Sequence, residues 1–385
     1  MDVLTARPRL LRWVVPLVVM AVALAGGIAL ATRSDGASPP LPPRTADQLL
    51  TDLSQANVPG LSGTVVATAR LGLPALPSAD GRGGGASLSS LLSGSRTIRV
   101  WYAGRQRVRL AVTGSLAEAD LIRNGQDLWS YQSEDNTVTH VRLPAGDAAD
   151  DKQQAAAGAT AVTPQEAARR LVAAITPTTT VRVERTARVA GRDVYQLRLR
   201  PKDPRSLIDA VVLAVDGQTR VPLQVQVLAK GESAPAYETG FTDVQFRVPD
   251  ADVFAFTPPP GAKVTERSLG QVARDKRQAQ AEGRAALAAG QPAVLGSGWT
   301  SVLVMRNVDL SAAGSGGTLR SLLNAATPVR GAFGNGRMLR TALVSGLLTD
   351  DGRLYVGAVT PAALQAAAAQ PLSAAKPLAG KGAAG

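Results

Sequence analysis

The sequence predicts an α+β protein in which a strongly curved antiparallel sheet, covered by helices, precedes a small α+β C-terminal domain. Three observations predict this fold. Turn signals recur at short intervals between apolar runs, about ten strands fit between residues 61 and 256, and 385 residues exceed one ordinary domain. Because so many strands in one sheet tend to curl or close, the sheet should enclose a concave, aliphatic interior.

Residues 96–143 carry the clearest strand signal. Gly and Asn/Asp turn signals separate short runs rich in β-branched and aromatic residues, which is typical of an antiparallel meander. Alternate residues of a strand share a face. One face is therefore apolar, with Ile98, Val100, Tyr102, Val108, Leu110 and Val112. The other face is basic, with Arg99, Arg107 and Arg109. Trp129 and Tyr131 share a face further along, where they could cap a pocket or pack in a core.

The N-terminal segment predicts export. Arg7, Arg9 and Arg12 precede an uncharged apolar run over residues 13–32, which orients the remainder away from the cytoplasm. Residues 1–32 could be an uncleaved membrane anchor or a signal peptide cut after Ala31. The anchor is favoured because the run exceeds a signal core of about 7–15 residues. Residues 33–44 are Pro-rich and predict an extended spacer.

Residues 45–265 predict the curved-sheet domain. Thr45 and Gln48 form a capping box before a helix, and residues 61–70 form a first strand. Residues 71–94 form a Gly-rich loop whose leucines could close over an apolar groove or be buried: Leu71, Leu73, Leu76, Leu88, Leu91 and Leu92. Pro164 begins a second helix. Five more strands follow, over residues 181–189, 194–200, 207–215, 221–229 and 237–248.

The C-terminal third predicts a second, smaller domain over residues 290–370, after a helical linker over residues 266–289. Its predicted strands span residues 299–310, 328–333, 338–348 and 354–359, and its helices residues 318–326 and 361–369. Asp351-Gly352 is a tight-hairpin signal. Residues 371–385 predict a disordered tail.

Composition excludes several function classes. The chain has no cysteine and one histidine, so thiol catalysis, disulfides and Cys-based metal sites are excluded, and we expect no metal and no cofactor. The net charge of +12 is spread as single arginines rather than in blocks, so we expect no nucleic-acid partner. Aromatic residues make up only 4% of the chain, which leaves Val, Leu and Ala to form the apolar interior.

Neither His140 nor the carboxylates of residues 147–151 predict catalysis or metal binding. No Gly-x-Ser-x-Gly or His-Glu-x-x-His motif frames His140, so a surface or cross-strand histidine is the favoured interpretation over a catalytic base. The carboxylates Asp147, Asp150 and Asp151 lack the Gly and terminal Glu of a calcium loop. The sequence therefore predicts a protein that is not an enzyme.

The motifs of the meander resemble a known family. AGRQRVRL at residues 103–110 and DLIRNGQDLWSYQSEDNTVT at residues 120–139 resemble the pattern of the LolA-like lipoprotein carriers and the MucB/RseB sensor domain. LGLPALP at residues 71–77, LLSGSRTIRVWYAG at 91–104 and FTDVQFRVPDADVFAFTPPPGAKVTE at 241–266 extend the resemblance. It implies an incomplete barrel with a helical lid that holds the acyl chains of lipids or lipoproteins. It also implies that Arg107 and Arg109 could latch the lid, the alternative being a solvent-exposed basic face.

Two functions remain open, and both place the protein on the extracytoplasmic side of the cytoplasmic membrane. The first is a carrier or sensor that binds a lipid or lipoprotein acyl chain in an apolar cavity. The second, implied by the resemblance, is an RseB-like regulator whose C-terminal domain contacts a membrane-bound anti-sigma factor. The residues expected to line the cavity and its lid are Val100, Tyr102, Val108, Leu110, Trp129, Leu71, Leu73 and Leu91.

Overall fold

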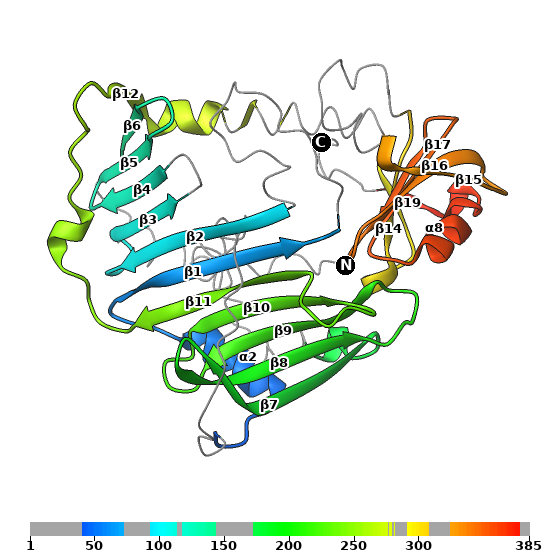
Figure 1. Ribbon diagram of the computed structural model, residues 1–385, viewed down its shortest axis with the longest axis horizontal. Helices are drawn as coiled ribbons and strands as arrows, with labels where there is room; N and C mark the ends of the chain where they lie inside the picture. The colour runs from blue at the N-terminus through cyan, green and yellow to red at the C-terminus, as the bar shows by residue number, and fades with distance from the viewer. Residues whose placement is uncertain are drawn as a thin grey trace, which may run out of the picture.

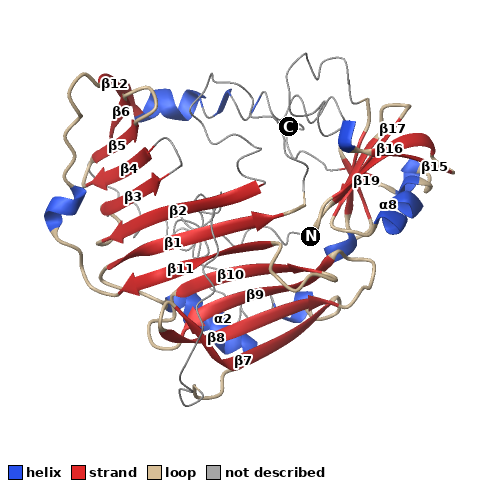
Figure 2. Ribbon diagram, in the orientation of Figure 1, coloured by secondary structure: helices blue, strands red, loops and turns tan. Residues whose placement is uncertain are grey.

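The structure is a computed structural model, and it contains a large curved sheet and a smaller sheet (Figure 1). It describes residues 41–72, 93–113, 118–143, 172–275, 277–278, 281, 291–307 and 324–377. Strands dominate and helices are few (Figure 2). The predicted fold class is confirmed: the large sheet is antiparallel apart from one pair, curved and not closed into a barrel, and a small α+β unit follows it.

The large sheet has twelve strands in the order β12-β6-β5-β4-β3-β2-β1-β11-β10-β9-β8-β7. Their bounds are β1 Leu61–Arg70, β2 Ser93–Tyr102, β3 Arg107–Thr113, β4 Glu118–Asn124, β5 Asp127–Gln132, β6 Thr137–Arg142, β7 Thr179–Val189, β8 Arg192–Pro201, β9 Ile208–Asp216, β10 Pro222–Ala229, β11 Tyr237–Gln245 and β12 Lys263–Ser268. Two meanders, β1 to β6 and β7 to β11, therefore meet where β1 pairs with β11. Short turns at residues 103–106, 125–126 and 133–136 join β2 to β3, β4 to β5 and β5 to β6, where the sequence carries turn signals.

Curvature comes from register shifts within the sheet. The β1–β11 ladder shifts between Thr64 and Val65, the β7–β8 ladder shifts between Glu184 and Ala187, and the β9–β10 ladder shifts twice. Each extra residue bends its strand and increases the local twist. The sheet therefore curves from β12 at one edge to β7 at the other (Figure 1).

Helix α2, Ala46–Gln55, packs near β7. The Thr45 hydroxyl accepts from the Gln48 backbone, and the Gln48 side chain accepts from the Thr45 backbone, so the predicted capping box is confirmed. Leu49 is fully buried. Asp52 of the helix lies 3.3 Å from Arg220 across an ion pair. One apolar turn and one ion pair thus attach the helix to the sheet.

The smaller sheet has the order β15-β16-β17-β18-β14-β13-β19. Its strands are β13 Ala293–Leu295, β14 Val302–Met305, β15 Thr327–Gly331, β16 Gly334–Arg340, β17 Ser345–Thr349, β18 Leu354–Gly357 and β19 Lys376–Pro377. Helix α8, Pro361–Ala368, covers one face, where Leu364 packs with Met338, Leu347 and Tyr355. The Asp351-Gly352 hairpin prediction is confirmed, because Gly352 has a φ of 77° between β17 and β18.

Four segments differ from the sequence prediction, the first being residues 293–295, which form β13 outside every predicted strand and pair with β14. The single strand expected over residues 338–348 is two strands, because the Thr341 hydroxyl accepts from Leu343 and Val344 and closes a turn. Residues 263–268, split between the domain and the linker by prediction, form β12, which pairs in parallel with β6. Residues 372–377 of the expected tail form a 3-10 turn and β19, which pairs with β13. Of the added strands, β12 and β19 each pair with a strand distant in sequence.

Main-chain hydrogen bonds join the two sheets. The Leu207 amide donates to the Ala358 carbonyl at 2.9 Å, and the Thr360 amide donates to the Arg205 carbonyl at 2.8 Å. Ser206 and Val359 form an isolated β-bridge between these bonds. The turn after β8 is therefore joined directly to the segment after β18, a contact that the predicted helical linker does not suggest. The predicted domain bounds themselves stay a prediction.

Several predicted features lie outside the described residues. They are the apolar segment over residues 13–32, most of the leucine-bearing loop, the carboxylates of residues 147–151, most of the helix that begins at Pro164, and the tail beyond residue 377. Within the part of the chain that the structure describes, no helix combines the length and apolar character needed to cross a membrane.

Candidate ligand-binding surface of the large sheet

One face of the large sheet is continuously aliphatic. We define this aliphatic face by its buried residues from five strands: Val65, Ile98, Val100, Leu110, Leu223 and Phe241. The register places them side by side, because Val65 pairs with both Ile98 and Phe241, and Val100 pairs with Leu110. Val100 is 7% exposed and Leu110 is 6% exposed. β-Branched residues at alternate positions produce this surface, as the sequence predicts.

The aliphatic face reaches solvent at β4. Leu110 pairs with Leu121, whose side chain continues the face and is 41% exposed. Tyr102 pairs with Val108 at the β2–β3 end of the same face, and Val108 packs against the buried cluster. An exposed leucine beside a buried aliphatic cluster gives a hydrocarbon chain a point at which to make contact.

The other end of the aliphatic face is polar. Arg96 lies on the same side of β2 as Ile98 and pairs with Ala67, which in turn pairs with Thr239. Burial lowers the pKa of the Arg96 guanidinium, and burial raises the pKa of Tyr237. The Thr239 hydroxyl is fully buried and has no hydrogen-bond partner among the residues that the structure describes. Polar groups at one end of an apolar floor suit an amphiphilic ligand.

The predicted site residues divide between the two faces. Val100, Tyr102, Val108 and Leu110 come together on the aliphatic face. Trp129 lies on the opposite face, because it pairs with Ile122, which pairs with Arg109. The register across four strands decides this division, and the spacing along one strand could not show it.

Leu71 is the one predicted lid leucine that falls within the described residues, and it lies beside the smaller sheet. It follows β1, and its carbonyl accepts from the Ala342 amide of the smaller sheet at 2.8 Å. Leu73 and Leu91 fall outside the described residues. The ligand-contact role of all eight predicted residues stays a prediction.

The opposite face of β3 to β6 is covered by a strap, which we define as residues 246–262 between β11 and β12. Its 3-10 turn, Ala251–Phe254, inserts Phe254, which is fully buried, against β3 and β4. Phe256 packs beside Trp129 with ring centroids 5.4 Å apart. Ile122 beneath the strap is also fully buried. The strap therefore covers this face of the sheet. Its residues carry no strong sequence signal for a helix or a strand.

Two of the three predicted face arginines hold the strap. Arg109 donates from Nη1 to the Val253 carbonyl at 3.2 Å and from Nη2 to Asp120 at 2.5 Å. The Arg107 guanidinium lies 5.9 Å from the centroid of the Phe254 ring. Arg107 and Arg109 therefore do not form a freely solvated basic face. Both side chains contact the strap.

His140 lies between two carboxylates beside the strap. Its Nδ1 is 2.8 Å from Glu266 and its Nε2 is 2.9 Å from Asp127, while its ring stacks on Trp129 with centroids 3.7 Å apart. Burial opposes the charged imidazole, but the hydrogen bonds to Glu266 and Asp127 outweigh it and raise the pKa of His140 above its ordinary value. A protonated ring donates to both carboxylates, so it holds β12 onto β6.

We expect His140→Gln to destabilise the protein more in acid than in alkali. Because the pKa is raised in the folded state, the contribution of protonated His140 is fully present below about pH 6.5 and is lost as the pH rises through the folded pKa. Thermal unfolding at about pH 5.5 and pH 8.5 measures the difference. An equal loss of stability at both values would contradict the charged role.

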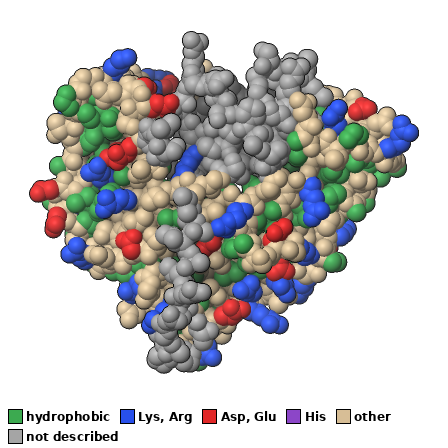
Figure 3. Space-filling view, in the orientation of Figure 1, with side chains coloured by type: hydrophobic (Ala, Val, Ile, Leu, Met, Phe, Trp, Pro, Cys, Tyr) green, Lys and Arg blue, Asp and Glu red, His purple; other side chains and the backbone are tan. Residues whose placement is uncertain are grey.

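Charged side chains of the described residues are dispersed rather than gathered into a site. Lys and Arg side chains alternate with acidic and apolar ones on the face that Figure 3 shows. The described residues contain no group of three or more potential metal ligands. We therefore take the aliphatic face as the candidate ligand-binding surface.

Comparison with solved structures finds 50 similar chains. The crystal structure of MucB in complex with MucA(peri) matches at 15% identity and a TM-score of 0.39, covering 87% of this chain and 100% of that chain. The MucA/MucB complex from Pseudomonas aeruginosa matches at 15% identity and a TM-score of 0.38, covering 87% and 99%. A LolA superfamily protein from Nitrosomonas europaea matches at 15% identity and a TM-score of 0.21, covering 56% and 99%.

A comparison with curated proteins finds no match. A family model described as "Predicted periplasmic protein (DUF2092)" matches residues 88–266. The matched segment runs from just before β2 to β12, so it contains most of the aliphatic face and the whole strap. Residues 88–266, just under half of the chain, are therefore similar to the DUF2092 family of predicted periplasmic proteins.

Proposed function

We propose that the protein is a non-enzymatic carrier or sensor that binds the acyl chain of a lipid or lipoprotein on the aliphatic face. The observation that carries the proposal is the continuity of this face. It runs through buried aliphatic residues to Leu121, which is 41% exposed, and it ends in the polar groups of Arg96, Thr239 and Tyr237.

The energetics favour such a ligand without any catalytic group. Each methylene removed from water contributes about 0.8 kcal/mol, so a chain that lies along a few aliphatic side chains gains several kcal/mol. We propose that the chain lies over Val100 and Leu110 and that its polar head lies toward Arg96. The positive charge of the Arg96 guanidinium, on the same side of β2 as Ile98, would attract an anionic head.

The proposed cellular setting is the outer side of the cytoplasmic membrane. The apolar run over residues 13–32 would anchor the chain there, and the Pro-rich residues 33–44 would hold the sheet away from the bilayer. An anchored protein cannot carry cargo far, so local hand-over or sensing fits better than a shuttle between membranes.

A second candidate is regulation of a membrane-bound anti-sigma factor through the smaller sheet. It is supported by the bridge between Ser206 and Val359, because a direct backbone contact would let ligand occupancy on the large sheet bias the smaller one. Capture of a single-pass regulator by the full chain, compared with and without bound lipid, tests this candidate.

We expect Leu121→Glu to weaken acyl-chain binding by at least about tenfold, because a carboxylate on the aliphatic face must be desolvated by the hydrocarbon. The matched control is Val264→Glu. Val264 is 47% exposed, and the register across β12, β6, β5 and β4 places it on the opposite face of the same sheet. Titration of the full chain with a fluorescent fatty acid measures both variants.

Mass spectrometry of lipid that co-purifies with the chain provides an independent readout. The proposal predicts lipid in the wild type and in Val264→Glu, and much less in Leu121→Glu. A wild-type protein that carries no lipid and binds no fatty acid would rule out the proposed function.

A further inference from the structure

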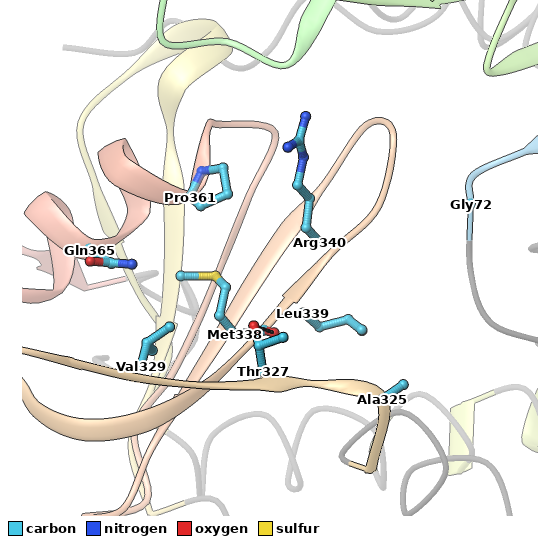
Figure 4. Close-up of a pocket in the computed structure, with 9 residues that line it drawn as sticks. All are labelled: Gly72, Ala325, Thr327, Val329, Met338, Leu339, Arg340, Pro361 and Gln365. Carbon is cyan, nitrogen blue, oxygen red and sulfur yellow. Dashed lines mark hydrogen bonds between the residues drawn. The ribbon is translucent and has the colours of Figure 1, made fainter.

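A separate cavity of about 620 Å³ lies beside the smaller sheet (Figure 4). Its walls come from β15, β16 and the first turns of α8, and Gly72 lies across from them at the end of β1. Beside the Cα of Gly72, where a side chain would begin, no other described atom lies within 4 Å. The volume is within the range of about 300–1,000 Å³ that small-molecule sites occupy.

The cavity has an apolar wall and a single cationic group. Val329, Met338 and Pro361 contribute hydrocarbon, Gln365 contributes an amide, and Arg340 contributes the only charge among the described lining residues. No aspartate or glutamate is among these lining residues. Pro361 is the first residue of α8, so the positive end of the helix dipole adds to the charge of Arg340.

Arg340 differs from its neighbours in the smaller sheet. Arg353 is paired with Asp351 at 2.6 Å, and Arg330 donates to the Asn335 side chain at 2.7 Å. Arg340 has no ion pair with any described residue and extends from the end of β16 beside Pro361 (Figure 4). A guanidinium without a carboxylate, next to apolar walls, leaves an anionic partner to be supplied by a ligand.

We propose that this cavity binds a small amphiphilic carboxylate. The carboxylate pairs with the Arg340 guanidinium, and the hydrocarbon body lies on Val329, Met338 and Pro361. Arginine suits this role because its planar fork donates to both carboxylate oxygens. The site is separate from the aliphatic face, since none of its lining residues belongs to β2, β3 or β4.

The sheet supplies a matched pair of variants. Met338, Leu339 and Arg340 of β16 line the cavity, whereas Arg337 of the same strand is not among its lining residues and lines a neighbouring pocket. Arg340→Gln should therefore remove the charge from the site, while Arg337→Gln changes the net charge equally and leaves the site intact.

The experiment is calorimetric titration of the full chain with sodium octanoate, in the Leu121→Glu background so that binding on the aliphatic face is suppressed. We expect binding that Arg340→Gln weakens at least about tenfold and Arg337→Gln leaves within about twofold. Gln365→Glu, which places a like charge beside the carboxylate, should weaken binding as well. Octanol, which lacks the charge, should bind at least about tenfold more weakly than octanoate.

Three results would overturn the proposal: no octanoate binding in the Leu121→Glu background, equal affinity in Arg340→Gln, or equal affinity for octanol. Thermal unfolding of each variant separates loss of binding from loss of folding. The proposed function is judged by the difference between Leu121→Glu and Val264→Glu, neither of which alters the Arg340 cavity, so a failure here leaves the proposed function standing.

Discussion

Asp216→Asn is expected to lower the free energy of unfolding by about 3 kcal/mol, the cost of removing one partner from a buried ion pair. The Asp216 side chain is 1% exposed. It accepts from Arg192 Nε at 2.5 Å, from the Thr219 amide at 2.6 Å and from the Thr219 hydroxyl at 2.8 Å. An asparagine of the same shape turns an NH₂ group toward these donors, so the loss is electrostatic rather than steric.

Urea unfolding of Asp193→Asn provides the control. Arg188 and Asp193 form a short pair at 2.9 Å, but both side chains are 37% exposed, so the loss there should stay below about 1 kcal/mol. Equal losses in the two variants would mean that burial does not set the strength of the Asp216 pair.

The Asp216 pair also predicts a pH dependence. Burial alone would raise the pKa of Asp216, but hydrogen bonds from Arg192 and Thr219 outweigh it and hold the pKa below its ordinary value. A lowered folded pKa gives stability that is present above about pH 4 and is lost as the pH falls through the folded pKa. The acid limb of the wild-type stability curve should therefore be steeper than that of Asp216→Asn.

Phe254→Ala is expected to cost about 3–5 kcal/mol and to release the strap from the sheet. Phe254 is fully buried against β3 and β4, and it is the residue on which the Arg107 contact depends. Removing the ring empties a space that β-strands on one side cannot collapse to fill. Proteolysis of the 246–262 segment, followed by mass spectrometry, should be faster in this variant in proportion to its lost stability.

Val248→Ala is the matched control, because Val248 lies in the same strap and is 48% exposed. It should change the stability by less than about 0.5 kcal/mol and leave proteolysis unchanged. If Phe254→Ala were cleaved no faster than Val248→Ala, the buried ring would not be what holds the strap.

Local sequence patterns predicted much of the fold. The capping box at Thr45 and Gln48, the Asp351-Gly352 hairpin and the strand over residues 61–70 all follow from nearest neighbours in the chain, and each is present. The same holds for the apolar alternation of Val100 and Leu110, which the structure buries on one face. These features need only propensity, periodicity and turn chemistry, which are encoded within a few residues.

Segments whose sequences lack a periodic apolar pattern could not be assigned to the fold from the sequence. β12 and β19 are short and polar, and each becomes a strand only because a distant strand offers a free edge. The strap has no apolar stripe, and a buried phenylalanine in its 3-10 turn determines which face it covers. A proline-rich connection with one buried ring cannot be told from an ordinary loop by any local pattern.

The sequence by itself predicted a long antiparallel sheet with one aliphatic face, and the structure contains both. Only the tertiary structure decided that Trp129 lies on the face opposite Val100, that Arg109 fastens the strap, and that Arg340 stands beside an apolar cavity. The physical reason is register. Alternation along a strand is a short-range property, but the neighbours of a side chain are set by pairings between strands that lie far apart in the chain.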